Sequence, residues 1–137
     1  MDHTTRLAND VRLACQLVSH KVRLESGSSL APHQLSVLFK LRKQPMTPGE
    51  LAEAEGVTAP SMTKTVAGLE SMGLIARGQD PGDGRRRIMT LTSAGGAALD
   101  DVASMRDSFM VARLAELSDG ERATLAEAAS ILRRVIE

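Results

Sequence analysis

Arginine is the residue type that gathers most densely in one short stretch of this chain. Residues 77–87 contain four arginines and two aspartates. The arginines are Arg77, Arg85, Arg86 and Arg87, and the aspartates are Asp80 and Asp83. A guanidinium group stays charged at all ordinary pH values and can bind a phosphate through two parallel hydrogen bonds. The stretch therefore predicts contact with phosphate groups.

The residues around these arginines predict a helix followed by a β-hairpin. Residues 74–79 and 86–91 favour two strands, and residues 80–85 between them have turn composition. The preceding helix is expected from about Ala59 to Met72, with an inward face formed by Met62, Val66 and Leu69. A helix fits the major groove of B-form DNA, and a cationic hairpin beside it can reach the flanking phosphates. This order of elements predicts DNA binding.

A shorter helix before this one completes a helix-turn-helix. Thr47 can cap it, Glu50 can reach back to the cap, and Gly56 can adopt the positive φ of a tight turn at its end. A further helix is expected from Pro32 to about Lys43. Its inward face would hold Leu35, Leu38, Phe39 and Leu41. A helix-turn-helix followed at once by a hairpin indicates a winged version of the motif.

Long apolar helices are expected at both ends of the chain. The first, at residues 4–25, has two apolar stripes, where a surface helix of a monomer needs one. The stripes are Leu7, Val11, Ala14, Val18 and Val22, and Leu13, Leu17 and Leu24. Thr92 can cap a helix that runs towards Leu117, and Ser118 with Glu121 forms a capping box for the last helix. The last helix should turn inward Leu125, Ala128, Leu132, Val135 and Ile136. The extra apolar surface predicts contact with a partner subunit.

Composition narrows the class of partner. The 137 residues include 17 basic and 17 acidic residues, so the net charge is zero and the DNA-binding interpretation depends on where the charges lie. Phe39 and Phe109 are the only aromatic residues, which argues against modules that stack RNA or single-stranded bases. The chain has one cysteine and no apolar run long enough for a signal peptide or membrane span. We expect a cytoplasmic protein without membrane contact.

These features resemble the MarR family of winged-helix repressors over essentially the whole chain, most densely at residues 47–95. The resembling residues are Leu51-Ala52-Glu53, Gly56-Val57, Ser61 to Lys64, Leu69-Glu70, Gly73-Leu74, Asp80-Pro81, Asp83, Arg85, Leu91-Thr92 and Gly95, with Leu30 to Gln34 and Val37-Leu38. The resemblance implies a mainly α fold: a winged helix-turn-helix domain with a small β-hairpin wing, plus N- and C-terminal dimerisation helices. Residues 1–137 would form a single domain, with residues 30–97 binding DNA and residues 1–29 and 98–137 forming the dimer.

The resemblance also implies roles for individual residues. Arg85 would be the wing-tip arginine and Asp83 the acid that orients it. We expect DNA contacts from Thr58, Pro60, Ser61, Thr63, Lys64, Arg77, Asp83, Arg85, Arg86 and Arg87. The chain departs from the family at Gly68 and Gly84, where a basic residue is common. The implied partners are a pseudo-palindromic double-stranded operator, a second copy of the chain, and a small aromatic or anionic effector that releases the repressor.

Other chemistry is less well supported by the sequence. Cys15 could make the chain a one-cysteine hydroperoxide sensor, but the chain has no tyrosine to activate it, so we expect a buried, inert thiol. His20 and His33 flank a turn and could line an effector cavity, although ordinary surface histidines explain them as well. We find no metal spacing, no cofactor motif and no catalytic constellation, and therefore expect no enzyme. A winged-helix protein-interaction module without DNA binding remains the rival from another class.

Overall fold

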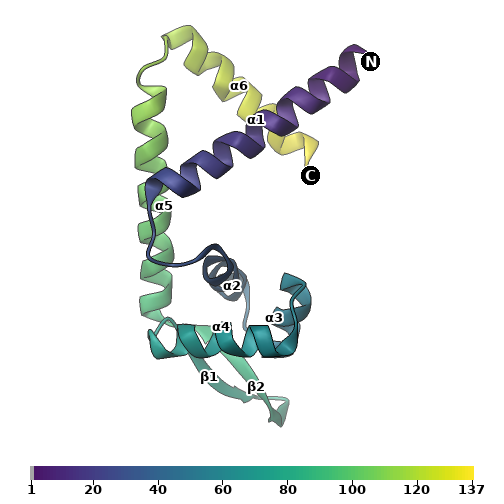
Figure 1. The fold of residues 1–137 in the computed structure, drawn as a ribbon, viewed down its shortest axis with the longest axis vertical. Coiled ribbons are helices and arrows are strands. Elements are labelled where there is room, and N and C mark those ends of the chain that lie inside the picture. The colour runs from purple at the N-terminus through teal and green to yellow at the C-terminus, as the bar shows by residue number, and fades with distance from the viewer. Residues whose placement is uncertain (1) are drawn as a thin grey trace. The chain divides into compact units, whose positions relative to one another are not determined.

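The computed structural model of the chain describes residues 2–137, which form six helices and one two-stranded antiparallel sheet (Figure 1). The helices are α1 (His3–Ser26), α2 (Pro32–Lys43), α3 (Pro48–Glu55), α4 (Ala59–Ser71), α5 (Ser93–Leu114) and α6 (Asp119–Val135). The strands are β1 (Ile75–Asp80) and β2 (Asp83–Leu91). The chain divides into two compact units, Ser28–Ala103 and the residues up to Gly27 together with Ser104–Glu137. The predicted mainly α, winged helix-turn-helix fold is confirmed.

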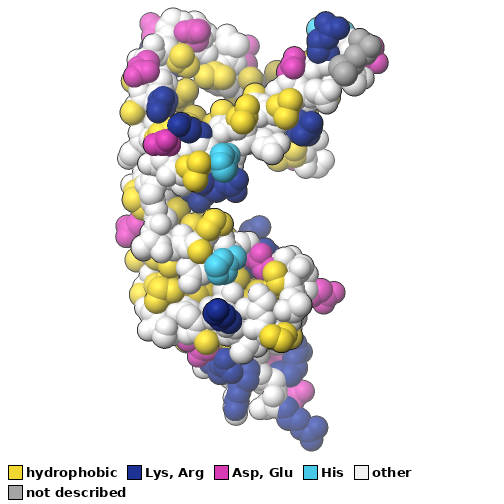
Figure 2. Space-filling model, in the orientation of Figure 1, with side chains coloured by type: hydrophobic (Ala, Val, Ile, Leu, Met, Phe, Trp, Pro, Cys, Tyr) yellow, Lys and Arg dark blue, Asp and Glu magenta, His cyan; other side chains and the backbone are white. Residues whose placement is uncertain are grey.

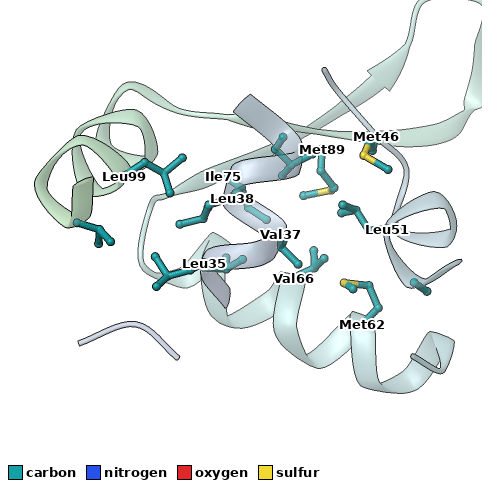
Figure 3. Close-up of a cluster of buried hydrophobic side chains, with 14 residues drawn as sticks. Leu35, Val37, Leu38, Met46, Leu51, Met62, Val66, Ile75, Met89 and Leu99 are labelled. Atoms are coloured by element: carbon teal, nitrogen blue, oxygen red, sulfur yellow. The ribbon is translucent and has the colours of Figure 1, made fainter. Parts of the chain in front are cut away.

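One aliphatic core holds the Ser28–Ala103 unit together (Figure 3). Helices α2, α3 and α4, strands β1 and β2 and the first half of α5 all contribute to it. Its fully buried members include Val37, Leu38, Leu51, Val66, Leu69, Met89 and Leu99. Phe39, predicted to face inward, is 36% exposed, whereas Val37, two positions earlier, is fully buried. The buried side of α2 is therefore rotated towards Val37 relative to the prediction.

Helix α3 begins and ends as the sequence predicts. The Thr47 hydroxyl accepts a hydrogen bond from the Glu50 amide at 3.1 Å, and the Glu50 carboxylate accepts one from the Thr47 amide at 3.0 Å. Gly56 follows the helix in the left-handed conformation, with φ 67° and ψ 33°. A residue with a Cβ would be strained at this φ, so the glycine sets the tight turn from α3 to α4.

Hydrogen bonds connect the end of α4 to the start of α5. Gly73 has φ 75°, which lets the Leu74 amide donate back to the Leu69 carbonyl at 3.1 Å. The Thr92 hydroxyl donates to the Gly73 carbonyl at 2.7 Å and accepts from the Gly95 amide at 3.1 Å. Thr92 therefore caps α5, as predicted, and also fixes the start of α5 against the α4–β1 turn.

The hairpin is longer and its turn is shorter than the sequence suggested. Strand β2 begins at Asp83, where turn composition predicted that the loop would continue to Arg85. Asp80 pairs with Asp83, so only Pro81 and Gly82 lie between the strands. The Asp80 carboxylate accepts a hydrogen bond from the Gly82 amide at 2.9 Å, which stabilises this tight turn. Gln79 pairs with Arg87 and Asp80 with Asp83, so Gly84, Arg85 and Arg86 belong to β2 but lie in an irregular segment without pairing partners on β1.

The terminal helices have little core of their own. Val22 is the one buried residue of α1, and α6 has none. The inward packing predicted for Leu125, Val135 and Ile136 does not occur within one chain, since they are 46%, 71% and 84% exposed. Exposed apolar residues on α1 are Leu7, Leu13, Leu17, Val18 and Leu24. No helix within residues 2–137 is long and apolar enough to cross a lipid bilayer.

Candidate nucleic-acid interface

Helix α4 presents its polar side because its apolar side is buried. Met62, Val66 and Leu69 lie in the core at helical spacing. The Thr58 hydroxyl accepts a hydrogen bond from the Ser61 amide at 3.3 Å and so caps the helix, and Pro60 lies in the first turn. Thr58 is therefore a structural cap in addition to its predicted DNA contact.

The exposed side of α4 carries the residues predicted from the sequence. Pro60, Ser61, Thr63 and Lys64 are all exposed. The Thr63 hydroxyl donates to the Ala59 carbonyl at 2.9 Å, one turn earlier in the helix. Lys64 forms no ion pair with any residue in the described part of the chain, residues 2–137. Its charge is therefore available to an anionic partner.

The hairpin arginines divide into paired and unpaired ones. Arg77 forms an ion pair with Glu70 of α4 at 2.9 Å. Arg86 lies between Glu50 of α3 and Asp80 of β1, at 3.3 Å from each. These contacts partly neutralise Arg77 and Arg86 and connect the hairpin to the two helices.

Arg85 and Arg87 remain as the uncompensated cations of the hairpin. Both are exposed, and neither forms an ion pair within residues 2–137. Arg87 pairs with Gln79 of β1, whereas Arg85 lies in the irregular segment of β2 between the paired residues Asp83 and Arg87. Figure 2 shows Lys and Arg side chains gathered over the hairpin end of the Ser28–Ala103 unit.

Asp83 acts on the backbone near the wing tip. Its carboxylate accepts a hydrogen bond from the Arg85 amide at 3.0 Å. The structure gives no ion pair between Asp83 and the Arg85 guanidinium, which the implied orienting role would require. Asp83 thus shapes the start of β2 and leaves the side chain of Arg85 free.

Sequence reasoning did not identify Glu50 and Glu70 as partners of the hairpin arginines. The hydrogen bonds from Thr47, together with the charge of Arg86, hold the pKa of Glu50 below its ordinary value. Glu50 therefore caps α3 and also contacts the wing. Its place at the third position of a capping box was visible in the sequence, but its contact with Arg86 depends on the tertiary fold.

The remaining predicted residues lie outside this surface. His20 belongs to the unit of the terminal helices and His33 to the Ser28–Ala103 unit. Both are exposed, and their predicted contact with an effector stays a prediction. Cys15 on α1 is exposed, so the expectation of a buried thiol is wrong for the single chain. The apolar neighbours that suggested burial are themselves exposed on α1.

Comparisons with known proteins find related regulators. The model of the MarR family matches residues 30–86. An HTH-type transcriptional regulator of Mycobacterium bovis is 34% identical over 139 residues, covering 100% of this chain and 97% of the relative. The chain belongs to the MarR family. It is accordingly a DNA-binding transcriptional regulator with a winged helix-turn-helix.

Solved structures match this MarR-family chain along nearly its whole length. The transcriptional regulator Tm0710 from Thermotoga maritima superimposes with a TM-score of 0.83 at 25% identity, covering 96% of this chain and 94% of that chain. A variant of MepR from S. aureus, bound to an oligodeoxyribonucleotide, superimposes with a TM-score of 0.70 at 20% identity, covering 93% and 98% of the two chains. The second likeness shows the shared fold, in a relative that is bound to DNA.

Proposed function

We propose that this MarR-family regulator is a dimeric, sequence-specific repressor that binds double-stranded DNA with α4 in the major groove. The β1–β2 hairpin then lies along the flanking backbone and minor groove. The observation that carries the proposal is the charge distribution. Lys64 on α4 and Arg85 and Arg87 on β2 are exposed cations without an ion pair in residues 2–137. We assign direct contacts to these three and to the exposed polar start of α4, and a positioning role to Arg77 and Arg86.

The test is a salt series of binding to mixed-sequence duplex DNA. Each phosphate neutralised by a cation releases condensed counterions, and log Kobs falls with log salt at a slope of about −0.9 per phosphate. Three cations per subunit give a slope of about −5 for a dimer on this relation. A winged-helix protein-interaction module without DNA binding would show no salt-dependent duplex binding, which would refute the proposal.

Arg85→Ala then tests the wing directly. Loss of a base-edge or minor-groove arginine contact should weaken specific binding by about 1–3 kcal/mol. Arg12→Ala is the matched control, because Arg12 is an exposed arginine on α1, outside the winged helix. Helix content and oligomeric state should be unchanged in both variants. Equal affinity of Arg85→Ala and the wild type at moderate salt would contradict the assignment of the hairpin as a DNA-binding wing.

The proposed homodimer is supported by the apolar surface of the terminal helices. Leu17 of α1 is 67% exposed and Val135 of α6 is 71% exposed in the single chain. Such surface is unfavourable in water, and a second copy would cover it. Two subunits related by a two-fold axis would bind a pseudo-palindromic operator with half-sites about one helical turn apart. Sedimentation that detects a folded monomer at low micromolar concentration would contradict an obligate dimer.

The remaining parts of the proposal rest on the family resemblance. We assign the protein to the cytoplasm, where its DNA partner lies, and regard it as a regulator and not an enzyme. Release of the operator by a small aromatic or anionic molecule, with His20 or His33 in contact, is also part of the proposal. Titrating the protein–operator complex with salicylate-type anions tests it, since an effector must lower operator affinity at concentrations where it binds the free protein.

A further inference from the structure

We propose that Thr63 recognises a thymine of the operator through its methyl group, so that α4 reads its half-site partly by apolar contact. The inference rests on the proposed placement of α4 in the major groove. It concerns the sequence preference of the regulator, which neither the family nor the fold fixes.

The exposed side chains of α4 offer few hydrogen bonds for reading bases. Between residues 59 and 67 they are Ala59, Pro60, Ser61, Thr63, Lys64 and Ala67. Arginine would pair with guanine through two hydrogen bonds, asparagine or glutamine would pair with adenine, and a carboxylate would accept from cytosine. None of these residue types occurs on the exposed side of this segment. Lys64 and Ser61 are the remaining donors, so most of the exposed side chains on this segment are apolar or short.

The hydroxyl of Thr63 is already hydrogen-bonded within α4, which leaves its methyl group as the part of the side chain that can contact a base. Its hydroxyl donates to the Ala59 carbonyl at 2.9 Å, so the hydroxyl proton is already used within the helix. This hydrogen bond also fixes χ1 of a β-branched side chain that is stiff in a helix. Thr63 is an exposed residue, and the hydrogen bond of its hydroxyl gives its methyl group a defined position on α4.

Thymine supplies the matching group. Its C5 methyl is the apolar group that base pairs display in the major groove, and threonine methyls are among the side-chain groups that contact it. Burying one methyl group contributes about 0.8 kcal/mol, which corresponds to about fourfold in affinity. The proposal therefore expects a modest, position-specific effect from a single methyl group.

The experiment begins with an operator selected by the wild-type protein from a random duplex library. Each thymine of one half-site is then replaced singly by deoxyuridine, which removes the methyl group and leaves the pairing and the minor groove unchanged. At one position we expect binding to weaken about fourfold at fixed salt. If no deoxyuridine duplex binds more weakly, the inference is wrong, although salt-dependent duplex binding would still support the proposed function.

Two variants of Thr63 assign the contact. Thr63→Ser removes the methyl and keeps the hydroxyl, whereas Thr63→Val keeps a methyl in the same place and removes the hydroxyl. Because both subunits of the proposed dimer lose the methyl group, Thr63→Ser should bind the thymine operator about sixteenfold more weakly, which is about fourfold per half-site, and lose its sensitivity to deoxyuridine at that position. Thr63→Val should keep both the affinity and the sensitivity, and circular dichroism should show wild-type helix content in both variants.

The opposite pattern would overturn the proposal. If Thr63→Val loses affinity and Thr63→Ser keeps it, the hydroxyl reads the base. If Thr63→Ser still responds to deoxyuridine as the wild type does, another residue contacts the methyl. Absence of any salt-dependent duplex binding would instead refute the placement of α4 on DNA, and the inference with it.

Discussion

Replacing Gly95 by alanine should destabilise the protein, whereas the same replacement at Gly96 should leave it as stable or slightly more stable. Gly95 lies in the first turn of α5, where that turn meets the backbone that follows α4. A Cβ on Gly95 would lie 2.1 Å from the Leu74 carbonyl oxygen and 2.6 Å from Cδ1 of Leu91. Contacts below 3.0 Å are essentially never observed for a real Cβ, so the backbone must move by about 1 Å.

The movement disturbs hydrogen bonds that connect α5 to the winged helix. The Leu74 carbonyl accepts from the Thr92 amide at 3.1 Å, and the Thr92 hydroxyl accepts from the Gly95 amide at 3.1 Å. Overpacking of this kind costs about 1–3 kcal/mol, and a lost hydrogen bond adds about 1 kcal/mol. Alanine recovers at most about 1 kcal/mol through its higher helix propensity. The net destabilisation expected for Gly95→Ala is therefore about 1–3 kcal/mol.

Gly96 is the matched control because it differs only in what surrounds it. A Cβ on Gly96 would meet Cδ2 of Leu91 at 4.0 Å, an ordinary van der Waals contact. Gly96→Ala should therefore gain a few tenths to about 1 kcal/mol from helix propensity. Urea unfolding followed by circular dichroism, at one protein concentration for all variants, measures both changes. The reasoning fails if Gly95→Ala proves as stable as Gly96→Ala.

Three further outcomes are expected. Gly68→Ala should raise the free energy of unfolding by up to about 1 kcal/mol, since its Cβ would meet only Gln34 Nε2 at 3.9 Å; a lower urea midpoint would contradict this. Burial raises the pKa of Glu55, but hydrogen bonds from Lys40 and Ser36 and the charges of Lys40 and His33 outweigh it, so the pKa lies below 4.5. The resulting stabilisation is present above pH 4.5 and lost as the pH falls through the folded-state pKa. Glu55→Gln should therefore be less stable than the wild type at neutral pH and approach the stability of the wild type in acid. The control Glu53→Gln, at an exposed position, should change the stability little. If the free energies of unfolding of Glu55→Gln and the wild type follow parallel curves against pH, the reasoning is wrong. Cumene hydroperoxide should affect operator binding equally in Cys15→Ser and in the wild type, because no tyrosine is present to activate the thiol. If the hydroperoxide releases the wild type from the operator and does not release Cys15→Ser, the protein is a hydroperoxide sensor.

The helix boundaries were predictable because their signals are local. Thr47 with Glu50, Thr92, and Ser118 with Glu121 all cap helices in the structure as the sequence indicated. A capping box needs only residues three apart, so tertiary packing has little influence on it. The hairpin turn was less predictable, because Asp83 and Gly84 have turn composition and yet lie on β2. Strand pairing, which composition does not encode, determines where that turn ends.

The distribution of charge over the candidate interface could not be predicted, since it depends on contacts between distant residues. Arg86 and Glu50 are 36 positions apart, and their ion pair requires the fold to bring α3 and β2 together. The sequence showed four arginines in the hairpin region, and the family resemblance singled out Arg85 among them, but nothing in the sequence separated paired from unpaired cations. The structure distinguishes Arg77 and Arg86, which have acidic partners, from Arg85 and Arg87, which have none within residues 2–137.

This division explains how a chain of zero net charge can carry a cationic surface. An acid beside an arginine lowers the local potential, but it also limits the rotation of the arginine and connects the elements that carry the two groups. Glu70 connects Arg77 to α4, and Glu50 connects Arg86 to α3, so both helices of the helix-turn-helix are joined to the wing. The acids near the interface therefore orient the hairpin, and Arg85 and Arg87 keep their charge for phosphate. Net charge measures solubility and long-range attraction, whereas affinity for DNA depends on the few cations that remain unpaired in the right place.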